Sequence, residues 1–177
     1  RESEAIVLSD EIYSQIIYEE SHLSIASVPG FLDRTVILDG FSKTYAMTGW
    51  RLGYGVFPEF LVEHVVRLVV NSVSCASTFV QRAAILALTG PQDETHRMVA
   101  EFRQRRDMVV NGLRQIPGIT CALPGGSFYV FPNIEGTGLT SDAFSNRCLM
   151  EAGVALLSGG SFGEYGNGYI RLSFANS

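Results

Sequence analysis

The chain has 177 residues, which is enough for one domain of ordinary size or two small ones. Apolar residues make up 46% and allow a sizeable core, while a net charge of −5 without clustered basic residues argues against a nucleic-acid partner. No apolar run reaches transmembrane length, and three widely spaced cysteines fit neither a metal site nor a disulfide framework, which favours reduced thiols in a cytoplasmic protein.

The first strand signal is the apolar run of residues 5–8, which predicts a buried strand. Asp10 follows it, and an acidic side chain at the carboxyl end of a buried strand lies where open α/β sheets bind ligands. The local pattern alone favours the alternative that Asp10 or Ser9 caps a following helix. Glu11 is predicted to be solvated or to act as a cap. The histidines at positions 22, 64 and 96 are predicted to be surface or helix-face residues.

A second strand signal comes from residues 36–38, after a polar loop over residues 21–33. The pair at 39–40 predicts a turn, and Lys43 follows in a loop. Desolvation of a lysine at the end of a buried strand lowers the pKa of its amine and makes it a Schiff-base nucleophile, whereas the alternative is an ordinary solvated lysine. Arg51 offers a cationic fork suited to a phosphate.

Residues 50–57 predict a strand, and helical periodicity then predicts three helices. The first helix is expected from Pro58 to about residue 71, the second over residues 78–88 and the third over residues 91–116. The arginines of the third helix are interpreted as a solvated face with intrahelical ion pairs rather than as a nucleic-acid helix. A composition change near Gly90 predicts the domain boundary.

The remainder alternates between short strands and one helix, which is typical of an α+β domain. The strands are expected at 119–122, 127–131, 154–157 and 169–174, and the helix at 140–152 with Thr140 or Ser141 as its cap. Arg171 lies inside the last apolar strand, where an unpaired buried charge is costly. It either binds a ligand or lies on an edge strand and reaches water.

Three segments carry a resemblance to a known family. The sequence Ser42-Lys43-Thr-Tyr-Ala-Met-Thr-Gly-Trp-Arg-Leu-Gly-Tyr closely resembles the cofactor-lysine motif of the class I/II aminotransferases, the fold type I pyridoxal-phosphate (PLP) enzymes of the aspartate aminotransferase superfamily. Ser-Asp-Glu-Ile-Tyr at 9–13 and Gly-Tyr-Ile-Arg-Leu-Ser-Phe-Ala at 168–175 resemble two further segments of that family.

The resemblance implies an α/β fold that corresponds to the C-terminal half of such an enzyme. Residues 1–90 would form the second half of the PLP-binding large domain, a mainly parallel sheet with helices. Residues 91–177 would form the α+β small domain, truncated at its end. There is no initiator methionine and the phosphate loop of the first half is absent, so we interpret the chain as a fragment that is inactive alone.

The resemblance also implies roles for the residues around the cofactor. Lys43 would hold PLP as a Schiff base and act as the catalytic acid and base. Asp10 would pair with the pyridine nitrogen, and the Tyr13 hydroxyl would bond the phenolic oxygen. Ser42 and Arg51 would bind the phosphate.

Two further positions concern the substrate and the phosphate. By the resemblance, Arg171 grips the α-carboxylate of the amino acid, since guanidinium and carboxylate match as a two-point fork. Relatives often carry a hydroxyl residue three positions before the lysine, where this chain has Gly40. That departure leaves this part of the phosphate site to backbone groups, water or another chain.

The implied reaction moves an amino group from an amino acid to a 2-oxo acid in a cytoplasmic homodimer, with no metal and with no nucleic-acid or membrane partner. Two alternatives stay open. One is a PLP-dependent lyase or synthase on the same scaffold, which product analysis would distinguish. The other is the aminotransferase-like effector domain of a transcription regulator, which a DNA-binding module in the preceding sequence would reveal.

Overall fold

The structure, a computed structural model, describes residues 4–176, so the termini that we interpret as truncation points lie outside the described range. The chain divides into two compact units, Arg1–His96 and Arg97–Ser177, and each is described by itself below. The assignment of residues 1–90 and 91–177 to a large and a small domain stays a prediction. Within residues 4–176, no helix is both long and apolar enough to cross a membrane.

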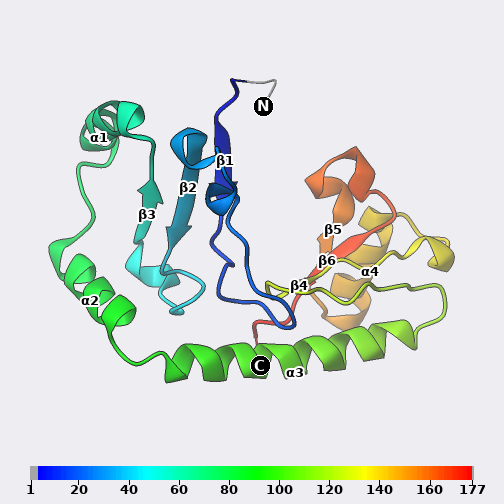
Figure 1. Cartoon of the computed structure of the whole chain (residues 1–177). Coiled ribbons are helices and arrows are strands. Elements are labelled where there is room, and N and C mark those ends of the chain that lie inside the picture. Colours follow the sequence, from blue (N-terminus) through cyan, green and yellow to red (C-terminus); the bar gives the residue numbers. More distant parts are fainter. Residues whose placement is uncertain (1–3, 177) are drawn as a thin grey trace. The chain divides into compact units, whose positions relative to one another are not determined.

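The first unit contains a three-stranded sheet in the order β1-β2-β3 (Figure 1). β1 (Val7–Asp10) pairs in parallel with β2 (Thr35–Gly40), and β3 (Gly53–Val56) pairs antiparallel with β2. β1 begins two residues later than predicted, and its side chains alternate between half-buried and exposed. Leu8 is 64% exposed, so the prediction of a buried strand is wrong for this residue.

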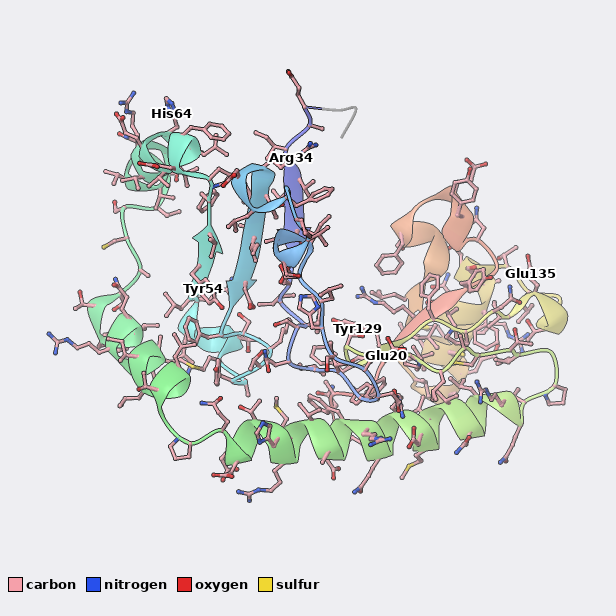
Figure 2. All side chains as sticks on the ribbon, viewed as in Figure 1. Glu20, Arg34, Tyr54, His64, Tyr129 and Glu135 are labelled. Carbon is pink, nitrogen blue, oxygen red and sulfur yellow. The ribbon has the colours of Figure 1, made fainter. Side chains whose placement is uncertain are left out.

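Two helices follow this sheet. α1 (Glu59–Ser72) and α2 (Thr78–Thr89) confirm the predicted helices, with Pro58 at the N-cap of α1 rather than in its first turn. The strand predicted over 50–57 is shorter, because residues 48–50 form a 3-10 turn before β3 begins. No residue of α1 is fully buried, whereas α2 buries Val80 and Ala84. Figure 2 labels His64 on α1, which is exposed as predicted, and His96 is exposed too.

α3 (Asp93–Arg114) confirms the long predicted helix, and its arginines do not all face water. Arg106 is only 2% exposed, so its prediction as part of a solvated face is wrong. Its guanidinium donates to the Asp107 carboxylate at 2.9 Å and to the Pro124 carbonyl at 3.0 Å. These contacts compensate the buried charge and join α3 to the segment after it.

The second sheet has the order β4-β6-β5, with antiparallel pairing throughout. β6 (Ile170–Ser173) is therefore the central strand, between β4 (Tyr129–Val130) and β5 (Leu157–Ser158). The strand predicted at 119–122 is reduced to one bridge between Thr120 and Asn133, because the chain on either side does not continue the ladder. The second sheet is therefore small.

α4 (Ser141–Ala152) covers this sheet region, and the open choice of its cap is settled in favour of Thr140. The Thr140 hydroxyl accepts from the Ala143 N–H at 3.2 Å, while the Ser141 hydroxyl accepts from the Gly168 N–H at 2.9 Å. The core of the unit is a cluster of three buried isoleucines with partly buried neighbours around it. Its members are Ile119, Ile134 and Ile170, with Leu113, Phe144, Leu156 and Leu172 packed against them.

Candidate active site

One end of the first sheet gathers most of the predicted site residues. β1 and β2 are parallel neighbours, with Asp10 opposite Leu38, so both strands end on the same side. β3 begins there, since Gly40 at the end of β2 lies opposite Gly53. We call this end of the sheet the carboxyl edge. The structure places four predicted site residues at it: Asp10, Ser42, Lys43 and Arg51.

The segment 41–52, here called the lysine loop, links β2 to β3 across this edge. Its apolar side chains hold it on α2: Phe41 and Met47 are buried in one cluster with Ala84. Backbone bonds tighten the loop, with the Tyr45 and Met47 N–H groups both donating to the Phe41 carbonyl at 3.3 and 3.2 Å. The loop that carries the lysine is therefore a packed element rather than a free surface turn.

Lys43 lies in the turn at the start of this loop and is half-buried, as is its neighbour Ser42. The carbonyl of Lys43 accepts from the Ala46 N–H at 3.3 Å, and the carbonyl of Thr44 accepts from the Thr95 hydroxyl at 3.3 Å. These hydrogen bonds fix the backbone of the turn that carries the Lys43 side chain. The residue is thus partly covered, which is compatible with the predicted desolvation of its amine.

The presence of glycine at position 40 has a steric explanation. A Cβ at this residue would lie 2.9 Å from the Gly53 Cα, closer than real Cβ contacts come, and a tight 3.1 Å from the Leu52 carbonyl oxygen. β2 and β3 approach so closely here that a hydroxyl side chain has no room. The backbones of the two strands therefore approach each other closely at Gly40 and Gly53.

Arg51 lies near the end of the lysine loop and adopts the left-handed backbone conformation, with φ at 55°. Its guanidinium folds back and donates to the Thr48 carbonyl at 2.8 Å, while the residue as a whole stays exposed. One N–H group of the fork is thus used for orientation, and the remaining donors are available to an anion.

Asp10 is exposed at the end of β1, and no helix follows it, so the prediction that it caps a helix is wrong. Its Oδ1 accepts from the Ile12 N–H at 3.3 Å in a local turn. Within residues 4–176 this is the one hydrogen bond recorded for its carboxylate, so Oδ2 can accept from a ligand. Tyr13 is half-buried in the turn that follows, where its carbonyl accepts from the Ile16 N–H at 2.9 Å.

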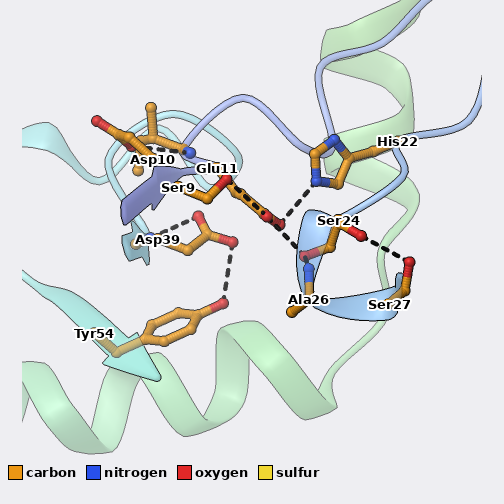
Figure 3. A network of polar contacts seen from close by, with 11 residues as sticks. Ser9, Asp10, Glu11, His22, Ser24, Ala26, Ser27, Asp39 and Tyr54 are labelled. Atoms are coloured by element: carbon orange, nitrogen blue, oxygen red, sulfur yellow. Dashed lines mark hydrogen bonds and ion pairs between the residues drawn. The ribbon is translucent and has the colours of Figure 1, made fainter. Parts of the chain in front are cut away.

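Glu11 overturns its prediction as a solvated or capping residue, because it is only 8% exposed. Figure 3 shows its carboxylate inside a polar network. The hydroxyl groups of Ser24 and Ser9 donate to Oε1 at 2.7 and 3.1 Å, and His22 Nε2 lies 2.8 Å from Oε2. His22 is itself exposed, as predicted, and its imidazole contacts the buried carboxylate of Glu11.

These contacts set the acidity of Glu11. Burial by itself raises the pKa of the carboxyl group, but the hydrogen bonds from Ser24, His22 and Ser9 and the charge of His22 outweigh it. The pKa therefore lies below its ordinary value, because the surroundings favour the ionised form.

The lowered pKa predicts that acid weakens the fold. A carboxyl group with a depressed pKa in the folded state stabilises it fully above the unfolded pKa and loses that contribution as the pH falls through the folded pKa. We expect the difference in urea midpoint between the unsubstituted protein and Glu11→Gln to be constant near neutral pH. It should shrink below about pH 4, the ordinary range of glutamate. A difference that does not change down to pH 2 would contradict this assignment.

Sequence reasoning also missed a second pair at the carboxyl edge. Asp39 and Gly40 belong to β2, so the turn predicted there is wrong. The Asp39 carboxylate accepts from the Tyr54 hydroxyl at 3.2 Å, across the strand pair that places the two residues opposite each other (Figure 3). Burial and the charge of Asp39 raise the pKa of the Tyr54 phenol. The two residues lie 15 positions apart, and no local feature of the sequence indicates their pairing.

Arg171 belongs to the second unit and lies on the central strand of its sheet. The alternative that it sits on an edge strand is therefore wrong. Its guanidinium carbon lies 4.4 Å from the ring centroids of both Tyr129 and Phe162, so aromatic rings flank it. A pocket of about 200 Å³ opens beside it, lined by Tyr129, Ala155, Leu156, Leu157, Arg171 and Ser173.

The surroundings of Arg171 leave its hydrogen-bonding edge for another acceptor. Among residues 4–176, no carboxylate is recorded in an ion pair with it. Aromatic rings interact with the flat faces of a guanidinium, whereas its N–H donors point outward in the plane. A carboxylate that lies in the plane of the guanidinium group can therefore accept hydrogen bonds from its N–H donors.

The donor set at the carboxyl edge fits PLP. A carboxylate with an open oxygen suits a protonated ring nitrogen, a guanidinium suits a phosphate, and a half-buried amine suits an aldehyde. Among the described residues, no group of three histidine, cysteine or acidic side chains is arranged to hold a metal ion.

Comparison with known proteins gives a consistent result. The model of the family "Aminotransferase class I and II" matches residues 1–177. The putative aminotransferase YugH of Bacillus subtilis is 40% identical over 177 residues, and the match covers 100% of this chain and 46% of that protein. An aspartate aminotransferase of Pyrococcus abyssi is 43% identical, with 99% of this chain and 46% of that protein covered.

The solved structures agree. The crystal structure of an aromatic aminotransferase from Pyrococcus horikoshii matches with a TM-score of 0.94 and 43% identity, covering 97% of this chain and 47% of that one. The mixed α/β fold is thus one part of the fold of these enzymes, and the chain spans about half the length of the curated relatives that it matches. Because the family model covers every residue, this chain belongs to the class I and II aminotransferases.

Proposed function

We propose that this chain forms the lysine-bearing part of a PLP-dependent aminotransferase that moves an amino group from an amino acid to a 2-oxo acid. The observation that carries the proposal is the carboxyl edge. It gathers an exposed carboxylate at Asp10, a half-buried amine at Lys43 and an oriented guanidinium at Arg51. The relatives named as aminotransferases support the same reaction class.

Each residue has a separate task. Lys43 would hold PLP through Nζ as a Schiff base, and Arg51 and Ser42 would bind the phosphate. Asp10 would pair with the protonated ring nitrogen, and the Tyr13 hydroxyl would donate to the phenolic oxygen. PLP, when bound, supplies an electron sink for the negative charge that develops at the substrate Cα.

Proton transfer is assigned to the lysine. The Nζ of Lys43 would take the proton from the substrate Cα as a general base. Arg171 would bind the α-carboxylate and so restrict the orientation of the substrate. Its flanking aromatic rings and the adjacent pocket support this role.

The wider assignment is part of the same proposal. Residues 1–90 are assigned to the large domain and 91–177 to the small domain of a homodimeric cytoplasmic enzyme. The three cysteines, all of them free thiols in the structure, support a reducing compartment. The net charge of −5 supports a small-molecule substrate over a nucleic acid.

Borohydride reduction followed by peptide mass spectrometry tests the proposal. The sample should be the longest natural polypeptide that contains these 177 residues, incubated with excess PLP. We expect a pyridoxyl adduct on Lys43, which is the only lysine in the sequence. A folded sample without an adduct would refute the cofactor assignment. An adduct on a lysine outside this chain would refute the role of Lys43.

A further inference from the structure

The Glu11 network is the polar cluster that the proposed reaction leaves without a task. Glu11 directly follows Asp10, yet its carboxylate is 8% exposed whereas Asp10 is exposed. Burying a charge is costly unless it is paired and hydrogen-bonded. Three side chains provide that compensation, as Figure 3 shows: Ser9, His22 and Ser24.

The network closes a loop in the chain. Its contacts join Glu11 to His22 and Ser24, which lie 11 and 13 residues further along. Ser24 is itself held in place, because its hydroxyl accepts from the Ala26 N–H at 3.3 Å and caps the 3-10 turn Ile25–Ser27. The intervening segment, which contains Tyr13, is thus fastened at both of its ends.

The backbone of Glu11 is fixed as firmly as its side chain. Its N–H donates to the Leu38 carbonyl at 2.8 Å and extends the pairing of β1 with β2 by one residue. Its carbonyl accepts from the Ser14 N–H at 2.8 Å and closes the turn that contains Tyr13. Glu11 is therefore the residue at which the strand of Asp10 and the turn of Tyr13 are joined.

We propose that Glu11 is a positioning residue, which acts through His22 and Ser24 to hold Asp10 and Tyr13 in the orientation that binds the pyridine ring. Glu11 itself does not touch the cofactor. The inference rests on the proposed function, because it assigns a task to Glu11 only if Asp10 and Tyr13 contact PLP. It predicts that removing the charge of Glu11 weakens PLP binding through those two side chains.

A mutant cycle on PLP affinity tests this coupling. The dissociation constant for PLP is measured by fluorescence titration of the apo form of the longest polypeptide that contains this chain. Glu11→Gln should raise it about tenfold, the expected effect of a weakened charge-assisted hydrogen-bond network. Glu63→Gln, which changes an exposed glutamate on α1, should leave it unchanged.

The decisive measurement repeats Glu11→Gln in the background of Asp10→Asn with Tyr13→Phe. A positioning residue loses its effect there, since the groups that it orients are already absent. The same tenfold change in both backgrounds would show that Glu11 acts independently of Asp10 and Tyr13, and would overturn the inference.

Two further measurements keep the test decisive. The unfolding temperature of each apo variant separates weak PLP binding from a failure to fold. If Glu11→Gln does not fold, Ser24→Ala and His22→Gln each remove one contact and are carried through the same cycle. Absence of PLP binding in the unsubstituted protein overturns the proposed function and this inference with it. Normal PLP binding by the network variants overturns the inference alone.

Discussion

Lys43→Ala is expected to abolish transamination by the longest polypeptide that contains this chain. The loss should reach at least about 100- to 10,000-fold, because a positioned acid–base group contributes a factor of that size. The substitution also removes the only amine side chain in these 177 residues, and so the covalent attachment of the cofactor. Steady-state rates with a range of amino acids and one 2-oxo acid provide the measurement.

Two controls separate lost chemistry from a lost fold. Lys43→Arg keeps the positive charge in the half-buried turn but offers no proton that can leave near neutral pH. It should be as inactive as Lys43→Ala. A small primary amine added to the alanine variant should restore part of the rate if the site is intact. A full rate in Lys43→Ala without added amine would exclude the lysine from the mechanism.

Arg171→Ala is expected to raise the KM for the amino acid by about 10- to 100-fold. A hydrogen bond to a charged group contributes about 1.5–3 kcal/mol, and each 1.4 kcal/mol is a tenfold change in affinity. Arg171→Lys should recover little of this, because a lysine has no planar fork to fit between the Tyr129 and Phe162 rings. KM and kcat for one amino donor are measured in parallel.

The matched control for Arg171 is Arg147→Ala on α4. Arg147 is ion-paired with Glu151 on the surface, so its loss should change the KM little. An amine substrate that lacks a carboxylate supplies the second control, since its KM should be equal in the unsubstituted protein and in Arg171→Ala. An unchanged KM for amino acids in Arg171→Ala would mean that another group binds the carboxylate.

The sequence predicted the helices well, because three of them show helical periodicity and the fourth has a capping residue before it. α1, α2, α3 and α4 all begin within two residues of their predicted starts. The short strands were less predictable. β4 and β5 have two residues each, and their positions depend on pairing with β6, which lies far away in sequence.

The residues of the candidate site also differ in how far they can be predicted from their neighbours in the sequence. Asp10, Lys43 and Arg51 could be proposed from signals in their own segments. Glu11 does not: its burial depends on His22 and Ser24, more than ten residues away, and nothing near Glu11 indicates them. Arg106 was missed likewise, because its acceptor at Pro124 lies 18 residues further along.

The backbone of Arg51 has a consequence for protein engineering. A residue with a side chain stays in the left-handed region at a cost of about 1 kcal/mol or more, whereas glycine adopts it freely. A screen that selects only for thermal resistance would therefore favour glycine at position 51. The selected variant would keep the turn but lose the guanidinium group. At this residue, a substitution that raises thermal stability would therefore remove a charge that can bind an anion.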